Sequence, residues 1–123
     1  MTNNEFKGEL EQRTKRFSVD LVNWLATLPN NRVVGSIIHQ LAKSGPSLGA
    51  NYREANRAES RPDFTHKIGI VEKEANETAY WFEVLLESNL LAQEQKSTGI
   101  PLHAEAGELL KLFSSISRSS RSH

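Results

Sequence analysis

The sequence predicts an all-α protein folded as an antiparallel up-down four-helix bundle. Four stretches of the 123-residue chain place apolar residues at alternating steps of three and four, the spacing that gives a helix one buried stripe. No β-branched run alternates between turn signals, as it would in a strand. Four helices with short connections pack best around a shared core with alternating directions. A repeat close to 3.5 residues further predicts shallow, left-handed crossings.

The first stretch ends at a clear stop signal. Its three-four spacing persists to Leu28 and is followed by Pro29, Asn30 and Asn31. Proline disfavours helical geometry in the residue before it, so the first helix should end here. Its stripe is Leu10, Thr14, Phe17, Leu21, Trp24 and Leu28.

The second stretch runs through a proline without losing its spacing. We therefore expect one long helix, kinked at Pro46 because proline lacks a donor and crowds the carbonyl of Ala42. The alternative is two shorter helices joined by a turn at Gly45, because Gly-Pro is a common turn signal. The stripe is Val34, Ile38, Leu41, Gly45, Leu48, Tyr52 and Ala55.

The third stretch carries the most regular pattern in the sequence. Ser60 and Asp63 resemble a capping box, and Pro62 suits a first helical turn. Small Ala75 and Thr78 in the middle of the stripe would let a partner helix approach closely. The stripe is Phe64, Ile68, Val71, Ala75, Thr78, Phe82 and Leu85.

The last helix is expected to open at Pro101, after a polar connection from Gln93 to Gly99. Residues 1–116 would then form a single domain. Residues 117–123 are rich in serine and arginine and contain no apolar residue, which predicts a disordered tail. The stripe of this helix is Leu102, Ala106, Leu109, Phe113 and Ile116.

Composition limits the classes of function. Fifteen basic and fifteen acidic residues balance to a net charge of +0, without the strong basic excess of a dedicated nucleic-acid binder. The absence of cysteine excludes disulfides and thiolate nucleophiles. No stretch resembles a signal peptide or approaches the roughly 20 apolar residues of a membrane-spanning helix. We therefore expect a soluble, cytoplasmic protein without a membrane partner.

No pattern of catalytic or metal-binding residues stands out. A di-metal bundle needs two Glu-x-x-His pairs, and the nearest match, Asp63-x-x-His66, occurs once. Gly45 and Gly49 lack the Lys-Ser/Thr that would follow in a phosphate-binding loop. We expect no enzymatic activity, no metal, no cofactor and no small-molecule substrate.

A basic ridge is the candidate nucleic-acid surface. Arg53, Arg57 and Arg61 are spaced by four residues, and Lys67 and Lys73 would extend the ridge beyond the turn. Tyr52 would supply a face on which a base stacks. The alternative is an ordinary solvated surface, because four carboxylates interleave with these cations: Glu54, Glu59, Asp63 and Glu72.

Apolar residues outside the stripes predict a contact between subunits. They lie on the second and third helices, at positions that a lone bundle would leave partly wet, and together they suggest a second buried face. The third helix is also acidic, and complementary charges on one protomer suit head-to-tail ring assembly, although a solvated face explains them equally well. The apolar residues are Val33, Ile37, Ile70, Tyr80 and Trp81.

Two segments carry a resemblance to a known family. Residues 44–55, SGPSLGANYREA, and residues 63–81, DFTHKIGIVEKEANETAYW, resemble the second and third helices of the bacterial "four helix bundle protein" family, also known as 23S ribosomal RNA intervening-sequence proteins. The resemblance implies a bundle that assembles into a ring-like homopentamer. It also implies kinship with accessory proteins of diversity-generating retroelements, which contact nucleic acid through a basic surface. The neutral charge balance of this chain departs from those relatives.

Two functional expectations follow. The first is a non-catalytic protein that forms a homo-oligomer, a pentamer by the resemblance, with no cellular role assigned. The alternative is an accessory protein that binds structured RNA or an RNA/DNA hybrid through the basic ridge.

Overall fold

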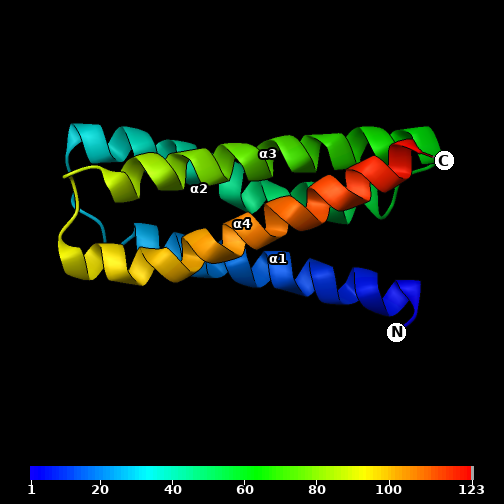
Figure 1. Ribbon diagram of the computed structural model, residues 1–123, viewed down its shortest axis with the longest axis horizontal. Coiled ribbons are helices and arrows are strands. Elements are labelled where there is room, and N and C mark those ends of the chain that lie inside the picture. Colours follow the sequence, from blue (N-terminus) through cyan, green and yellow to red (C-terminus); the bar gives the residue numbers. More distant parts are fainter. Residues whose placement is uncertain (123) are drawn as a thin grey trace.

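The structure, a computed structural model, describes residues 1–122 as four helices and short connections. Each helix packs against two of the others, α1 and α3 both against α2 and α4, as in a four-helix bundle. No strand occurs in residues 1–122, so the predicted all-α class is confirmed. Figure 1 shows both termini and the α2–α3 turn at one end of the bundle, and the other two turns at the opposite end. The helices are α1 (Asn3–Leu25), α2 (Arg32–Ala55), α3 (Arg61–Glu87) and α4 (Gln93–Arg121).

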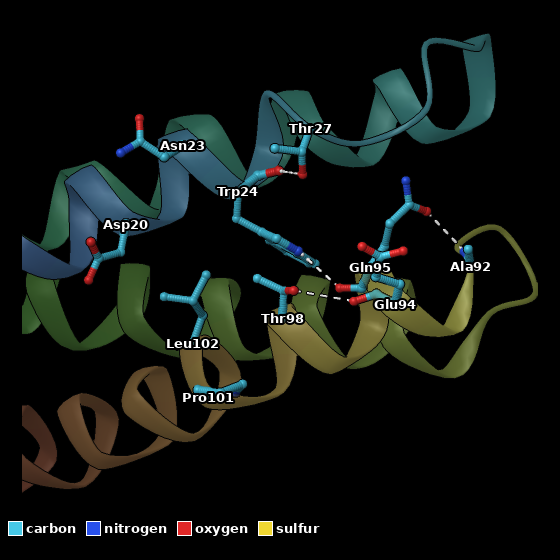
Figure 2. A pocket seen from close by; sticks show the side chains of 10 residues that line it. All are labelled: Asp20, Asn23, Trp24, Thr27, Ala92, Glu94, Gln95, Thr98, Pro101 and Leu102. Atoms are coloured by element: carbon cyan, nitrogen blue, oxygen red, sulfur yellow. Dashed lines mark hydrogen bonds between the residues drawn. The ribbon is translucent and has the colours of Figure 1, made fainter.

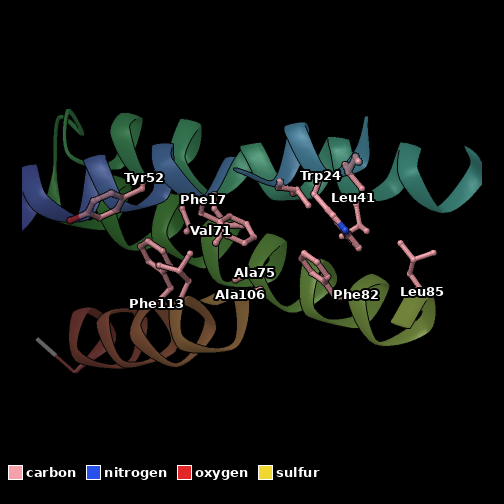
Figure 3. Close-up of a cluster of buried hydrophobic side chains, with 14 of the residues drawn as sticks. Phe17, Trp24, Leu41, Tyr52, Val71, Ala75, Phe82, Leu85, Ala106 and Phe113 are labelled. Carbon is pink, nitrogen blue, oxygen red and sulfur yellow. The ribbon is translucent and has the colours of Figure 1, made fainter. Parts of the chain in front are cut away.

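Aromatic rings fill the centre of the core (Figure 3). The Phe82 ring is fully buried and stacks on Trp24, with centroids 5.6 Å apart and planes at 15°. Phe17 lies 6.4 Å from Phe82, centroid to centroid. Nearer the end that carries the termini, Tyr52 meets the edge of Phe113 at 5.2 Å. These contacts link all four helices, because the rings come from each of them.

Helix α2 continues through Pro46 without a break. This excludes a turn at Gly45 and confirms one long helix, while the kink at Pro46 stays a prediction. On the neighbouring turn a buried hydroxyl pair joins α2 to α3, with Ser44 Oγ 2.9 Å from Thr78 Oγ1. Both side chains are almost fully buried, so the pair satisfies polar groups that would otherwise cost stability inside the core.

Side-chain caps define where α2 and α3 begin. The Asn31 side chain accepts a hydrogen bond from the Val34 amide at 3.0 Å. The Ser60 hydroxyl accepts one from the Asp63 amide at 3.1 Å, which confirms Ser60 as the N-cap of α3. The hydrogen bond from Lys67 holds the pKa of Asp63 below its ordinary value.

The start of α4 differs from the prediction. The helix begins at Gln93, so the segment predicted to be a polar connection is helical and Pro101 lies inside the helix. The Gln95 side chain accepts a hydrogen bond from the Ala92 amide at 2.9 Å and thereby stabilises the first turn. The indole of Trp24 donates to the Gln95 carbonyl at 3.0 Å and anchors this turn to α1. This contact with α1 therefore lets α4 begin about two turns before the predicted start at Pro101.

The predicted disordered tail and the domain boundary at residue 116 also differ from the structure. Helix α4 continues to Arg121, and Ser117 and Ser120 are buried. Arg121 donates to the Ser117 hydroxyl at 2.7 Å, and the Ser120 hydroxyl hydrogen-bonds that of Thr65 on α3. Small hydroxyl side chains thus continue the buried stripe that larger apolar residues begin. Residue 123, the last of the predicted tail, lies outside the described residues.

No helix within residues 1–122 has the length and apolar character needed to cross a bilayer.

Candidate interaction surfaces

The predicted basic ridge lies at the α2–α3 turn, but internal contacts occupy much of it. Arg53 is 3.7 Å from a carboxylate oxygen of Glu11 on α1. Lys67 pairs with Asp63 one turn away at 3.0 Å. The Arg57 side chain donates to the Arg53 carbonyl at 2.8 Å. Arg57 and Arg61 are exposed and are the members best placed to meet a phosphate.

The expected stacking role of Tyr52 is wrong. Its side chain is only 2% exposed, because it packs on Phe113 inside the bundle. Burial raises the pKa of the Tyr52 hydroxyl above its ordinary value. With so little of its side chain exposed, Tyr52 offers no open face on which a nucleic-acid base could stack.

Lys73 is not brought to the ridge, and a residue from the predicted tail is. Lys73 lies twelve residues after Arg61 on α3, which is about 18 Å along a helix. Arg121 instead lies near Arg61, since both line an open pocket of about 590 Å³ together with His66. The sequence pattern missed Arg121 because it lay in a segment predicted to be disordered.

The five residues predicted for the subunit contact do not form one patch. Ile37 is 8% exposed and belongs to the core, whereas Ile38, predicted in the stripe, is only half-buried. Val33 is 56% exposed near the start of α2. Ile70 and Trp81 are half-buried on α3 and share one side of it, since eleven residues make about three turns.

The outer side of α3 carries an aromatic pair that is partly exposed. Tyr80 is 55% exposed and meets the edge of the Trp81 ring, with centroids 5.2 Å apart. Half-buried Val84 follows Tyr80 by one turn. A hollow of about 450 Å³ lies beside Tyr80, with Leu110 of α4 in its wall. We refer to Tyr80, Trp81 and Val84 as the α3 patch.

A second exposed apolar surface lies on α1 and was missed at the sequence level. Val19 and Val22 are 43% and 49% exposed, and Ala26 follows them by one turn. We refer to these three residues as the α1 patch. Lys15 lies on the same side of the helix, four residues before Val19. The patch could have been recognised in the sequence, because the spacing of its three residues places them together on the face opposite the buried stripe.

A groove follows α1 and α4 where the two helices are in contact (Figure 2). It has a volume of about 660 Å³, and Trp24 and Leu102 form much of its apolar wall. Asp20 and Glu94 are the charged residues of its lining. No three His, Asp or Glu side chains gather in a metal-binding arrangement anywhere in residues 1–122.

Comparison with known families and structures agrees with this architecture. Residues 7–115 match the profile of the 23S rRNA-intervening sequence protein family. The chain belongs to this family. A crystal structure of a protein of unknown function from the S23 ribosomal protein family of Bacteroides thetaiotaomicron is similar to it, with 36% sequence identity and a TM-score of 0.77. The similarity covers 91% of this chain and 97% of that one. No curated protein matches the chain.

Residues 44–55 form one of the two segments that resemble the intervening-sequence protein family. Close packing of α1 on α2 explains why two positions in this segment are glycine. A Cβ atom on Gly49 would lie 3.1 Å from the Thr14 hydroxyl, and one on Gly45 would overlap the Leu21 side chain. These glycines therefore let α1 and α2 approach closely along one face, where larger residues would force the helices apart.

Proposed function

We propose that this intervening-sequence family protein is a non-catalytic, cytoplasmic assembly protein whose protomers form a closed homo-oligomeric ring. The observation that carries the proposal is the pair of apolar patches on α1 and α3. The resemblance described above gives five as the expected number of copies.

The two patches favour head-to-tail contact. Helices α1 and α3 lie diagonally across the bundle, because the backbone of each approaches those of α2 and α4, while the two helices meet only through core side chains such as Trp24 and Phe82. The α1 patch and the α3 patch therefore face in opposite directions. A head-to-tail contact between two different surfaces leaves one α1 patch and one α3 patch free at the two ends of the growing series, and these meet to close a ring when the rotation permits.

Charge supports the same pairing. Lys15 and Arg16 accompany the α1 patch, whereas around the α3 patch the carboxylates of Glu77, Glu83 and Glu87 outnumber the single cation Lys73. Opposite charges around an apolar contact favour the correct partner and disfavour contact between like patches. The hollow beside Tyr80 offers space for a side chain of the next protomer.

Mixing two disabled variants tests this arrangement. We expect the wild type to elute as an oligomer, with Val19→Glu/Val22→Glu and Tyr80→Glu each eluting as monomers. A mixture of the two variants should form heterodimers and nothing larger, because each retains only one functional patch. Size exclusion with light scattering, at micromolar concentration, measures all four masses.

The control is Ile100→Glu, which places the same charge at a similarly exposed site on α4 and should leave the oligomer intact. A monomeric wild type would overturn the proposal. A variant that still forms dimers alone would show a symmetric contact in place of a ring.

A second candidate function is nucleic-acid binding at the bundle end that carries the α2–α3 turn. The observation in its favour is that Arg57 and Arg61 are exposed, and that Arg61 and Arg121 line the same pocket. Phosphates are bound by such clusters through charge, so affinity falls as salt rises. The candidate ligand is structured RNA or an RNA/DNA hybrid.

We expect Arg57→Ala/Arg61→Ala/Arg121→Ala to weaken binding of an RNA hairpin. The slope of log affinity against log salt concentration should also become shallower by about two to three, because fewer phosphates are contacted. Fluorescence anisotropy at several salt concentrations measures both quantities. Lys111→Ala, an exposed lysine on α4 outside both proposed surfaces, is the matched control. Unchanged affinity in the triple variant would remove this surface as the binding site.

A further inference from the structure

Helices α1 and α4 are in contact at one end of the bundle and diverge at the other (Figure 1). Near the α3–α4 turn they are joined by the Trp24 indole, which donates to the Gln95 carbonyl. Towards the middle, Arg13 and Glu105 form a bidentate pair, with N–O distances of 2.7 and 2.8 Å. Beyond this pair, towards the termini, a cavity of about 650 Å³ lies between the two helices and the start of α3.

Several apolar side chains that line this cavity are only partly covered by the rest of the bundle. Phe6 lies one turn before buried Leu10, in register with the core stripe of α1, yet it is 39% exposed. Phe64 opens the core stripe of α3 and is half-buried. Leu112 and Ile116 line the α4 side and are also half-buried. Apolar surface in a concave space of this volume is typical of a site for a small ligand.

The charged side chains that line the cavity are both positive. Lys7 and Arg61 line the cavity, and no aspartate or glutamate within residues 1–122 does. Neither cation has an ion-pair partner among the described residues, in contrast to Arg53 and Lys67. Ser115 and Ser119 add neutral hydrogen-bonding groups. Arginine suits a planar or tetrahedral anion because its donors form a rigid fork.

These features select one chemical class of ligand. A cation would meet Lys7 and Arg61, and a polar ion without an apolar part would leave both phenylalanine rings uncovered. We propose that this cavity binds a small organic anion with an aromatic or aliphatic body, its charge held by Lys7 and Arg61 and its body between Phe6 and Phe64. The site lies at the opposite end of α1 from the α1 patch, so it is independent of the proposed ring contact.

The test uses 8-anilinonaphthalene-1-sulfonate, an aromatic sulfonate that fluoresces when bound in an apolar site. We expect saturable binding of one probe per protomer to the full-length protein. Binding should weaken at least about tenfold in Lys7→Ala/Arg61→Ala, because both charged contacts are lost. Lys111→Ala, an exposed lysine on α4, is the matched control and should bind as the wild type does.

Because this dye also binds loosely packed states, each variant is first checked for an unchanged thermal melt. A measurement on the wild type alone locates the site. The probe should shift the backbone amide NMR signals of Lys7, Ser115 and Ser119 and leave those of Asn23 and Thr98, in the groove of Figure 2, unchanged.

Competition then identifies the body of the ligand. Displacement of the dye by adenosine monophosphate indicates an aromatic body, and displacement by decanoate indicates an aliphatic one. The proposal is overturned if neither anion displaces the dye, if the shifts map to another surface, or if the double variant binds with unchanged affinity.

Discussion

Replacing Phe82 by alanine is expected to lower the free energy of unfolding by about 3–5 kcal/mol. The ring is 0% exposed and stacks on Trp24 on one side and on His103 on another, at centroid distances of 5.6 and 5.8 Å. Its loss removes buried apolar surface and leaves a cavity that the surrounding rings cannot readily fill. Urea denaturation followed by circular dichroism gives the free energy.

Lys111→Ala is the control for this substitution, because Lys111 is exposed on α4 away from both patches and should change stability by less than about 0.5 kcal/mol. A loss below about 1 kcal/mol in Phe82→Ala, with an unchanged denaturant slope, would show that Phe82 is not central to the core.

The third helix shows how much of the fold the sequence determines. From Ile68 to Leu85 every stripe residue is buried, as the regular spacing predicts. Phe64, the first stripe residue, is only half-buried because it lies beside the cavity where α1 and α4 diverge. Periodicity identifies the face that points inward, but it does not reveal how closely the neighbouring helices pack at each level.

Helix α2 shows the limit of periodicity more clearly. Both Ile37 and Ile38 are compatible with a stripe that includes Val34 and Leu41, because residues three and four positions apart lie on the same face of a helix. The structure buries Ile37, which lies one heptad before Ser44 and so shares the side that meets Thr78 of α3. Since α2 packs more extensively on α3 than on α1, its buried stripe is turned towards α3.

The errors in α4 come from residues that are not apolar. Ser117 and Ser120 have no hydrophobic signal, yet they are buried because their hydroxyls are satisfied by hydrogen bonds. At the other end, Gly99 is buried because the Trp24 ring packs directly on it, so closely that a Cβ atom there would overlap the ring. A pattern built on apolar residues cannot detect either kind of position.

The candidate surfaces were less predictable than the core. Exposure of Val19, Val22 and Tyr80 depends on which face each helix turns outward, and the sequence singled out only Tyr80 among them. The cavity beside Phe6 depends on the divergence of α1 from α4, which no local pattern encodes. Sites formed between helices therefore need tertiary structure, whereas the stripes that build the bundle do not.

Replacing Ala75 by leucine is expected to lower the free energy of unfolding by about 1–3 kcal/mol. Ala75 and Ala106 are both 1% exposed, on helices α3 and α4 that pack against each other (Figure 3). Small side chains on both helices allow this approach, so a leucine on α3 must push α4 away or adopt a strained rotamer. A thermal or urea melt of the variant measures the loss.

Ala104→Leu is the matched control, since Ala104 is exposed on α4 and leucine is nearly as good a helix former as alanine. The control should retain the wild-type stability within about 0.5 kcal/mol. If Ala75→Leu also retained the wild-type stability, the α3–α4 contact around residue 75 would have to contain unfilled space. Because overpacking acts by separating helices, we expect Ala75→Gly to lose only about 1 kcal/mol, mainly from backbone entropy, without this displacement.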